Sequence, residues 1–417
     1  MKRTLTVIPV FLLVAVAAAV AQEETLLTED EFLSVLDEAH PASIALSGDM
    51  GAAEARRQQA ALLEDPRLEF VREQLDDLPR ETVWGVAWTP PIDGRRRWAV
   101  REAEAGVEAE RSSYESELTK LRLEMRRVFA DWAEGHTRVS IVIEHFGRLE
   151  SLAQRMRHRA ELGEESVLNA RRLEIASRSS AAELSSARAD TIAAQAEAEA
   201  WLVSSIGPPG GTAATGSDSS AIQPVLPELP EIPEGVDSSL RPDLMATRFR
   251  AEQAEAQNRL SHRVIAAPEL LLGWQTIKTS AVEFDGPVFG LNWEIPIFDR
   301  RQADRSAART AVASALARTE WLTRQAQGEY SAALGTYVEL RDAAISAQET
   351  LADLGRVVEA ATAAYEQGES SVTDLLDTLR AVLDARLSAL DLYSAALEAH
   401  RNLELTTGRS LTSGGLS

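Results

Sequence analysis

The sequence predicts a mainly α-helical protein with a membrane β-barrel, built from two tandem copies of one structural unit. Three observations carry this prediction: an apolar leader, a repeat spaced by 205 positions, and long helical periodicity that follows short strand periodicity. Each copy is expected to run helix, strand, strand, very long helix and return helix.

The chain begins with a segment that is typical of a secretory signal peptide. Two basic residues, Lys2 and Arg3, precede an apolar run from Leu5 to Val20, and small residues flank its end at Ala19 and Ala21. We therefore expect residues 1–21 to be removed on export.

Composition argues against several kinds of site. The chain has no cysteine, so disulfides, thiolate metal sites and a lipid anchor on cysteine are excluded. The formal net charge of -22 disfavours nucleic acid, whose phosphates attract Lys and Arg. No two histidines are spaced i, i+4, and no serine lies in a GxSxG motif, so we expect no metal, no cofactor and no enzymatic activity.

The internal repeat extends over about 85 residues in one register. "TVWGVAWTPPIDGRR" at 82–96 aligns with "PVFGLNWEIPIFDRR" at 287–301, and "ELGEESV" at 161–167 aligns with "EQGESSV" at 366–372. We predict a first structural repeat at 22–206, a Pro/Gly/Ser-rich linker at 207–240, a second repeat at 241–408 and a tail at 409–417.

Strand periodicity comes first in each copy. Strands are expected at about 66–90 and about 268–295, where bulky residues alternate with small ones. The bulky positions predicted to face lipid are Trp84, Trp88, Phe289 and Trp293.

Helical periodicity then continues to the end of each copy. Apolar residues step by four and three, as in a coiled coil, through two seams: Tyr114, Leu118, Leu121, Met125, Val128 and Trp132, then Ala326, Tyr330, Ala333, Tyr337, Leu340 and Ala344. Helical hairpins are expected at about 95–206 and about 299–408. Gly163 and Gly368 are the predicted hairpin tips, because glycine ends a helix and the serine that follows can cap the next one.

Two copies supply only four strands, which cannot close a barrel. A sheet in lipid must have no free edges, since lipid cannot satisfy unpaired backbone groups. Three chains would supply 12 strands, which is within the range of membrane barrels. The sequence therefore predicts a homotrimer that forms a 12-stranded β-barrel and a long periplasmic α-helical barrel.

The chain resembles the TolC-like outer-membrane efflux protein family, also called outer membrane factors. The matching motifs are "RPDL" at 241–244, "GLNWEIPIFDRRQ" at 290–302 and "YEQGESSVTDLLD" at 365–377, with the closing helix 383–408. Within the family, "PPIDGRRR" and "PIFDRRQ" look closest to the CzcC-like subgroup, which serves heavy-metal efflux pumps.

The resemblance implies a periplasmic gate at the tip of the second hairpin. By position the family's tyrosine and two aspartates fall on Tyr365, Asp374 and Asp377. The first copy has Asn169 and Arg172 at the positions of the two aspartates. The alternative for the aspartates is that they are solvated acids in the first turns of a helix.

The resemblance also implies a function and partners. The expected function is a passive outer-membrane exit duct for small molecules or metal cations. It would dock to a periplasmic adaptor and to an inner-membrane transporter of the RND or ABC type, with outer-membrane lipid around the barrel. The outer-membrane component of a type I protein secretion system remains an alternative, as does a periplasmic coiled-coil scaffold without a pore.

Overall fold

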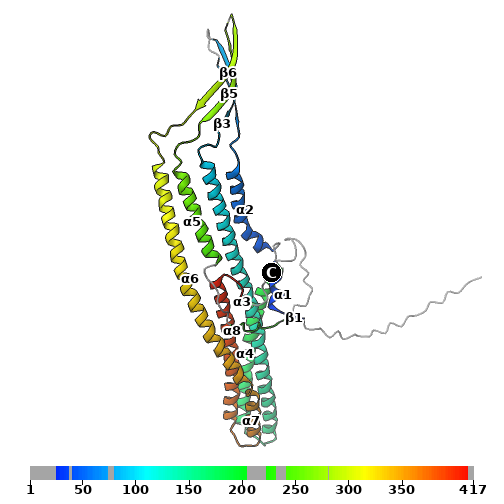
Figure 1. Ribbon diagram of the computed structural model, residues 1–417. Coiled ribbons are helices and arrows are strands. Elements are labelled where there is room, and N and C mark those ends of the chain that lie inside the picture. Colours follow the sequence, from blue (N-terminus) through cyan, green and yellow to red (C-terminus); the bar gives the residue numbers. More distant parts are fainter. Residues whose placement is uncertain are drawn as a thin grey trace, which may run out of the picture.

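The protein is an elongated rod with a small β-sheet at one end and two helical hairpins at the other (Figure 1). The computed structural model describes residues 25–36, 40–73, 79–203, 222–231, 241–279 and 281–411. The predicted signal peptide lies outside these residues, as do most of the predicted linker and most of the C-terminal tail.

Four antiparallel strands form the sheet, in the order β2-β3-β5-β6. They are β2 (Arg67–Glu73), β3 (Arg80–Trp88), β5 (Glu269–Lys278) and β6 (Glu283–Asn292). The central pair, β3 and β5, joins the two repeats in the middle of the sheet. The outer strands β2 and β6 each have one edge without a strand partner among the described residues.

One face of the sheet is apolar and exposed. The register places side chains of all four strands in continuous rows, for example Leu68, Val86, Leu272 and Phe289. A second row holds Phe70, Trp84, Trp274 and Pro287. This is the alternation that the sequence predicts, with the bulky residues on the outside.

The opposite face carries mostly small and polar residues, with a few larger apolar side chains such as Leu271 and Phe284. Gly85 and Gly273 lie directly opposite each other. A Cβ atom on Gly85 would lie 2.7 Å from the Leu272 carbonyl oxygen, and one on Gly273 would lie 2.6 Å from the Trp84 carbonyl oxygen. Only glycine fits this close approach of the two strands.

Four helices extend from the same end of the sheet and form the rod (Figure 1). They are α2 (Pro41–Ala61), α3 (Arg95–Glu161), α5 (Pro242–Ser261) and α6 (Gln302–Leu351). With 67 residues, α3 is about 100 Å long at 1.5 Å per residue. It packs against α2 and α5 near the sheet and against α4 (Val167–Val203) farther along. The two predicted coiled-coil seams are buried or half-buried.

Each hairpin reverses at a glycine in the left-handed region. Gly163 separates α3 from α4 with φ 78°, and Gly368 separates α7 (Leu354–Glu366) from α8 (Val372–Thr407) with φ 77°. The backbone bonds agree: the amide of Glu164 donates to Arg159, and the amide of Glu369 donates to Ala364. The two copies of the repeated heptapeptide thus make the same turn.

The second hairpin differs from the first in one respect. The sequence predicts one continuous helix before its tip, but the helix is interrupted between Leu351 and Leu354, which separates α6 from α7. Neither proline nor glycine lies in the interruption, and Gly355 follows it. The low helix propensity of Gly355, in the first turn of α7, is the only local feature at the break that disfavours a continuous helix.

Part of the predicted linker is bound to the helices by backbone and side-chain hydrogen bonds. Strand β4 (Ile222–Pro224) pairs in parallel with β1 (Thr25–Leu27), which precedes helix α1 (Glu29–Leu33). Farther along, the Tyr393 hydroxyl donates to the Pro227 carbonyl at 2.9 Å, and the Tyr337 hydroxyl donates to the Pro230 carbonyl. The extended, proline-rich segment exposes carbonyls that these tyrosines satisfy.

Replacing Gly368 with Ala is expected to lower the free energy of unfolding by roughly 1 kcal/mol, because its φ of 77° disfavours any residue with a Cβ. No heavy atom lies within 4 Å of a Cβ built there, so the effect comes from the backbone alone. Gly335, inside α6 and equally open, is the control: Gly335→Ala should stabilise by roughly 0.5–1 kcal/mol. Urea denaturation followed by circular dichroism measures both. Equal signs for the two variants would contradict the assignment.

Candidate functional site

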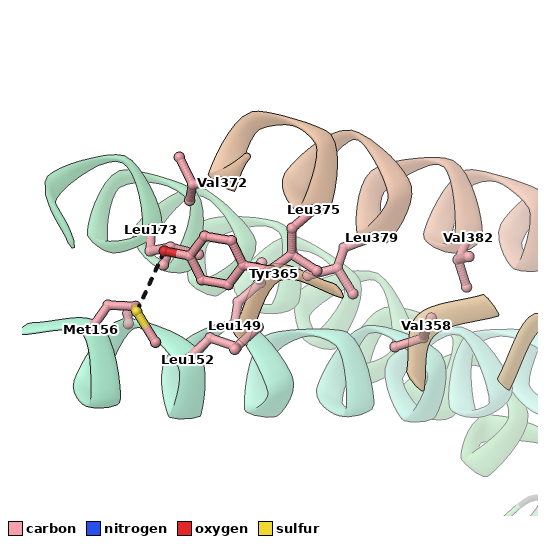
Figure 2. Packing of buried hydrophobic residues seen from close by; sticks show 11 residues of the cluster. Leu149, Leu152, Met156, Leu173, Val358, Tyr365, Val372, Leu375, Leu379 and Val382 are labelled. Atoms are coloured by element: carbon pink, nitrogen blue, oxygen red, sulfur yellow. Dashed lines mark hydrogen bonds between the residues drawn. The ribbon is translucent and has the colours of Figure 1, made fainter. Parts of the chain in front are cut away.

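Tyr365 lies inside the packing between the two hairpins (Figure 2). It is 8% exposed and belongs to a cluster formed by α3, α4, α7 and α8: Leu149, Leu152, Ala153, Met156, Leu173, Val358, Val372, Leu375, Leu379 and Val382. Its hydroxyl lies 3.4 Å from the Met156 sulfur and 3.4 Å from a Glu165 carboxylate oxygen. Burial, together with the Glu165 charge, raises the pKa of Tyr365.

Asp374 caps its own helix. The Ser371 hydroxyl and amide donate to its carboxylate at 2.7 Å and 3.1 Å, and the Asp374 amide donates back to the Ser371 oxygen at 3.2 Å. This reciprocal pair is a capping box at the start of α8. The hydrogen bonds from Ser371 lower the pKa of Asp374, so the exposed carboxylate is ionised at neutral pH.

Asp377 lies one turn farther along α8 and is exposed. Among the described residues it has neither a hydrogen bond nor an ion pair. It lines a cavity of about 440 Å³ between α3, α4 and α8, together with Arg172 and Arg380. Of the two aspartates, Asp377 is therefore the one whose carboxylate has no hydrogen-bond or ion-pair partner among the described residues.

The arginines near the tip are bound to other groups. Arg171 pairs with Glu174 at 2.6 Å, and Arg172 donates to the Thr373 hydroxyl at 3.0 Å. Arg380 pairs with Asp384 at 3.2 Å. Within one chain, no ion pair among the described residues joins these arginines to either aspartate.

The first hairpin uses its equivalent positions differently. Asn169, at the position of Asp374, donates from its amide nitrogen to Glu165 at 3.0 Å. The same glutamate contacts the Tyr365 hydroxyl, so this side of the tip connects the two hairpins. Acidic side chains at both repeat positions are found only in the second hairpin.

The four bulky residues predicted to face lipid all lie on the exposed apolar face. Trp84 is 55% exposed, Trp88 38%, Phe289 77% and Trp293 50%. Trp88 donates its indole N–H to the Glu64 carbonyl at 3.2 Å, and Trp293 donates to the Ala266 carbonyl at 3.0 Å. Each repeat thus ties the end of its second strand to the loop before its first strand in the same way.

A buried charged network at mid-length was not predicted from the sequence. Arg126 on α3 contacts Glu404 on α8, and its Nε donates to Glu29 on α1 at 3.0 Å. His400 lies beside them with its Nδ1 3.7 Å from Glu404. Arg126 sits between two seam residues, Met125 and Val128, and that position in an apolar seam was the only available signal.

The described residues contain no group of His, Cys, Asp and Glu side chains placed to hold a metal ion. Within the same part of the chain, none of the helices combines the length and apolarity that a membrane crossing requires.

Comparison with known proteins agrees with the observed architecture. The family model of outer membrane efflux proteins matches residues 238–409. The second repeat is an outer membrane efflux protein domain. The resemblance to TolC-like outer-membrane factors, predicted from the sequence, is thereby confirmed, and the first repeat extends the same fold. No curated protein matches the chain by sequence.

Solved channel structures match nearly the whole chain beyond the efflux protein domain. The CusC structure superposes with a TM-score of 0.73 at 16% identity and covers 92% of both chains. The outer-membrane protein VceC from Vibrio cholerae has a TM-score of 0.71 at 15% identity, over 92% of this chain and 97% of that one. The open-state MtrE channel from Neisseria gonorrhoeae has a TM-score of 0.68 at 15% identity, over 91% and 89%. These matches confirm the predicted fold class for the single chain.

Proposed function

We propose that the protein is the outer-membrane exit duct of a tripartite efflux system and that it works as a homotrimer without catalysing a reaction. The observation that carries this proposal is the four-stranded sheet, with one apolar face and one face of mostly small and polar residues, next to a helix about 100 Å long. A coiled-coil scaffold without a pore leaves such a sheet without a purpose.

Trimerisation follows from the two open sheet edges. Strands β2 and β6 each leave backbone donors and acceptors unpaired along one side. In lipid these groups must find partners, and β6 of one chain can pair with β2 of the next. Three copies of four strands close a 12-stranded barrel, which the apolar face would surround with contacts to outer-membrane lipid.

The hairpin tips are the proposed periplasmic end of the duct. They lie at the end of the rod opposite to the sheet (Figure 1). A periplasmic adaptor would dock near Gly163 and Gly368, and an inner-membrane transporter of the RND or ABC type would supply the energy. The type I secretion alternative shares this arrangement, because the substrate is selected by the transporter.

Asp377 is the centre of the proposed gate. Acidic side chains recur every seven residues on the exposed face of α8, at Asp377, Asp384, Asp391 and Glu398. A seven-residue period returns to the same face of a coiled-coil helix, so in a trimer these acids would line the duct. Asp384 and Asp391 are paired with Arg380 and Arg138, so among the described residues Asp377 and Glu398 carry the unpaired negative charge of this lining. Unpaired acids in a duct attract cations, which supports metal cations, and the CzcC-like subgroup, as the substrate class. Tyr365 would act indirectly by holding the two hairpins together.

The variant Asp377→Asn is expected to weaken block of the channel by a multivalent cation. The concentration of hexamminecobalt needed for half-block should rise by on the order of tenfold, because each chain loses one uncommitted charge at the constriction. Asp374→Asn should shift the block less, since the Asp374 carboxylate is bound to Ser371. Conductance in planar bilayers measures both.

Asp190→Asn is the matched control for the gate. Asp190 is exposed on α4 in the first hairpin and undergoes the same change in charge. If the control shifts the block as much as Asp377→Asn does, or if Asp377→Asn leaves it unchanged, the gate assignment is wrong.

The duct itself is tested with the wild-type protein. We expect a detergent-extracted trimer that gives discrete conductance steps in a planar bilayer. A protein that fractionates as a soluble monomer and gives no steps would contradict the duct and favour the scaffold.

A further inference from the structure

The apolar face of the sheet continues past the ends of the strands. Beyond Trp88 the chain reaches Ile92, which is 73% exposed. Beyond Trp293 it reaches Ile295 and Ile297, and the next residue, Phe298, is 91% exposed. Contiguous apolar side chains exposed on these loops indicate a surface that contacts lipid or protein rather than water. They extend the proposed lipid-facing surface toward the helices.

Arginines without carboxylate partners begin where this apolar surface ends. Arg97 and Arg101 at the start of α3, with Arg259 at the end of α5, surround the Trp98 ring at 5.9, 5.3 and 5.8 Å from its centroid. None of the three forms an ion pair among the described residues. Farther along the rod some arginines, such as Arg127 and Arg138, are paired with carboxylates, whereas others, such as Arg122, form no ion pair among the described residues.

A cavity of about 470 Å³ lies at the junction of the two repeats. Its apolar wall includes Ile92, Ile265 and Trp293, and its polar side includes His262 and Arg263. The loop 262–268 from the second repeat and the loop 92–93 from the first repeat form its walls. The cavity therefore offers an apolar surface and a cationic surface at the same depth.

One arginine lines the polar side of this cavity and a second lies next to it: Arg263 is part of the wall, and Arg309 contacts the lining residue His262 from α6. An Arg309 guanidinium nitrogen lies 3.5 Å from the His262 Nε2. The Arg263 guanidinium lies over Gly94, where an added Cβ would be 3.8 Å from its Cζ. The nearby acid, Asp93, is already paired with Arg95 at 3.4 Å. Arg263 and Arg309 have no carboxylate partner in the described part of the chain, so an anion at this position would neutralise an otherwise uncompensated charge.

We propose that this junction cavity binds the phosphate headgroup of an anionic phospholipid. Arg263 and Arg309 would contact the phosphate, and an acyl chain would lie along Ile92 and Trp293. Guanidinium groups bind phosphate with paired hydrogen bonds, and an apolar wall beside them distinguishes a lipid from a free anion. The inference rests on the proposed membrane position of the sheet. The apolar face of the sheet needs only hydrocarbon chains around it, whereas this cavity would bind the phosphate headgroup of one lipid.

The test titrates short-chain phosphatidylglycerol into the detergent-purified full-length protein and follows the rise in its unfolding temperature. Short-chain phosphatidylcholine and inorganic phosphate are added to parallel samples. Phosphatidylglycerol alone is expected to raise the unfolding temperature at low concentration. In the double variant Arg263→Gln/Arg309→Gln the apparent affinity should fall by about 25-fold, at a factor of about five for each arginine near an anionic lipid.

The matched control is Arg122→Gln/Arg318→Gln. Both arginines are exposed on α3 and α6, lack ion pairs among the described residues and lie away from the cavity. The control should keep the wild-type affinity. Equal responses of the wild type to the two lipids would overturn the proposal, and this arm needs no variant to fold.

Two further outcomes would also overturn the site. The same response to inorganic phosphate would make it a free-anion site, and equal losses in the two double variants would reduce it to an effect of net charge. Planar-bilayer conductance of the same preparations separates this proposal from the duct. A conducting protein without a headgroup preference contradicts only the lipid site, whereas absence of conductance contradicts the duct.

Discussion

Replacing Arg126 with Met is expected to lower the free energy of unfolding by about 3–5 kcal/mol, the range found when one partner of a buried ion pair is removed. Arg126 is 7% exposed and Glu404 is fully buried. The substitution leaves the Glu404 carboxylate without its cationic partner in a site that water does not reach. Urea denaturation in detergent, followed by circular dichroism, measures the loss.

The expected loss is large because the network connects distant parts of the chain. Arg126 on α3 binds Glu29 near the N-terminus and Glu404 near the end of α8. The carboxylate of Glu404 also accepts the Leu411 amide at 2.8 Å, which holds the chain beyond α8. Burial raises the pKa of Glu404 even beside the guanidinium, so desolvation weighs heavily on this carboxylate.

The neighbouring arginine provides the control. Arg127 forms ion pairs with Glu124, Asp131 and Glu197, but its side chain is 40% exposed. Arg127→Met should cost at most about 1 kcal/mol, because water screens such pairs. Adding Glu404→Gln to Arg126→Met should recover part of the loss by removing the unpaired charge. If Arg126→Met and Arg127→Met lowered the free energy of unfolding equally, burial of the ion pair would not determine the loss of stability, and the prediction would be wrong.

Acidification is expected to destabilise the protein through His400, by about 3 kcal/mol between pH 6.5 and pH 4. Burial, reinforced by repulsion from Arg126 and Arg401, lowers the pKa of His400 from 6.5 to about 4. The unfolded chain therefore binds a proton in this window while the folded chain does not. The contribution of neutral His400 to stability is complete above pH 6.5 and is lost as the pH falls toward 4.

A variant that cannot titrate isolates this effect. His400→Phe keeps an aromatic ring against Tyr337, whose ring centroid lies 5.0 Å away, and it removes the buried Nε2, which has no hydrogen-bond partner. The difference between wild type and variant in the free energy of unfolding should change by about 3 kcal/mol over the window. His158→Gln, at an exposed site on α3, should follow the wild-type curve. A parallel curve for His400→Phe would contradict the prediction.

Both predictions concern the level at which the two repeats and the chain ends meet. The apolar cluster there contains Phe32, Met125, Phe129 and Trp132, together with Val128 and Ala198. We infer that the charged network, with this cluster, fastens α1 and α8 to the long helix α3.

Much of the architecture was predictable because it depends on local rules. Strand alternation around Trp84 and Trp293, the seams of the long helices and the turns at Gly163 and Gly368 each involve residues close together in sequence. A repeat doubles each signal, since the same pattern occurs twice in one register. The single-chain fold could therefore be read before any contact was known.

The residues of the proposed gate were predictable as positions but not in their surroundings. The resemblance placed Tyr365, Asp374 and Asp377 at one tip. Their environments differ: Tyr365 is packed between the hairpins, Asp374 caps its helix, and Asp377 is left uncommitted. Periodicity assigns a residue to a face of its own helix, but it does not say which neighbouring helix covers that face.

The sequence by itself determined the two repeats, the order of strands and helices, and the hairpin turns, because these follow from backbone preferences and from periods of two and of three to four residues. Only the tertiary structure decided the contacts of Arg126 with Glu404, the attachment of the linker to Tyr337 and Tyr393, and the junction cavity beside Arg263. These features join residues that lie far apart in the chain, and their energies depend on burial and on charges from other elements, which no local pattern contains.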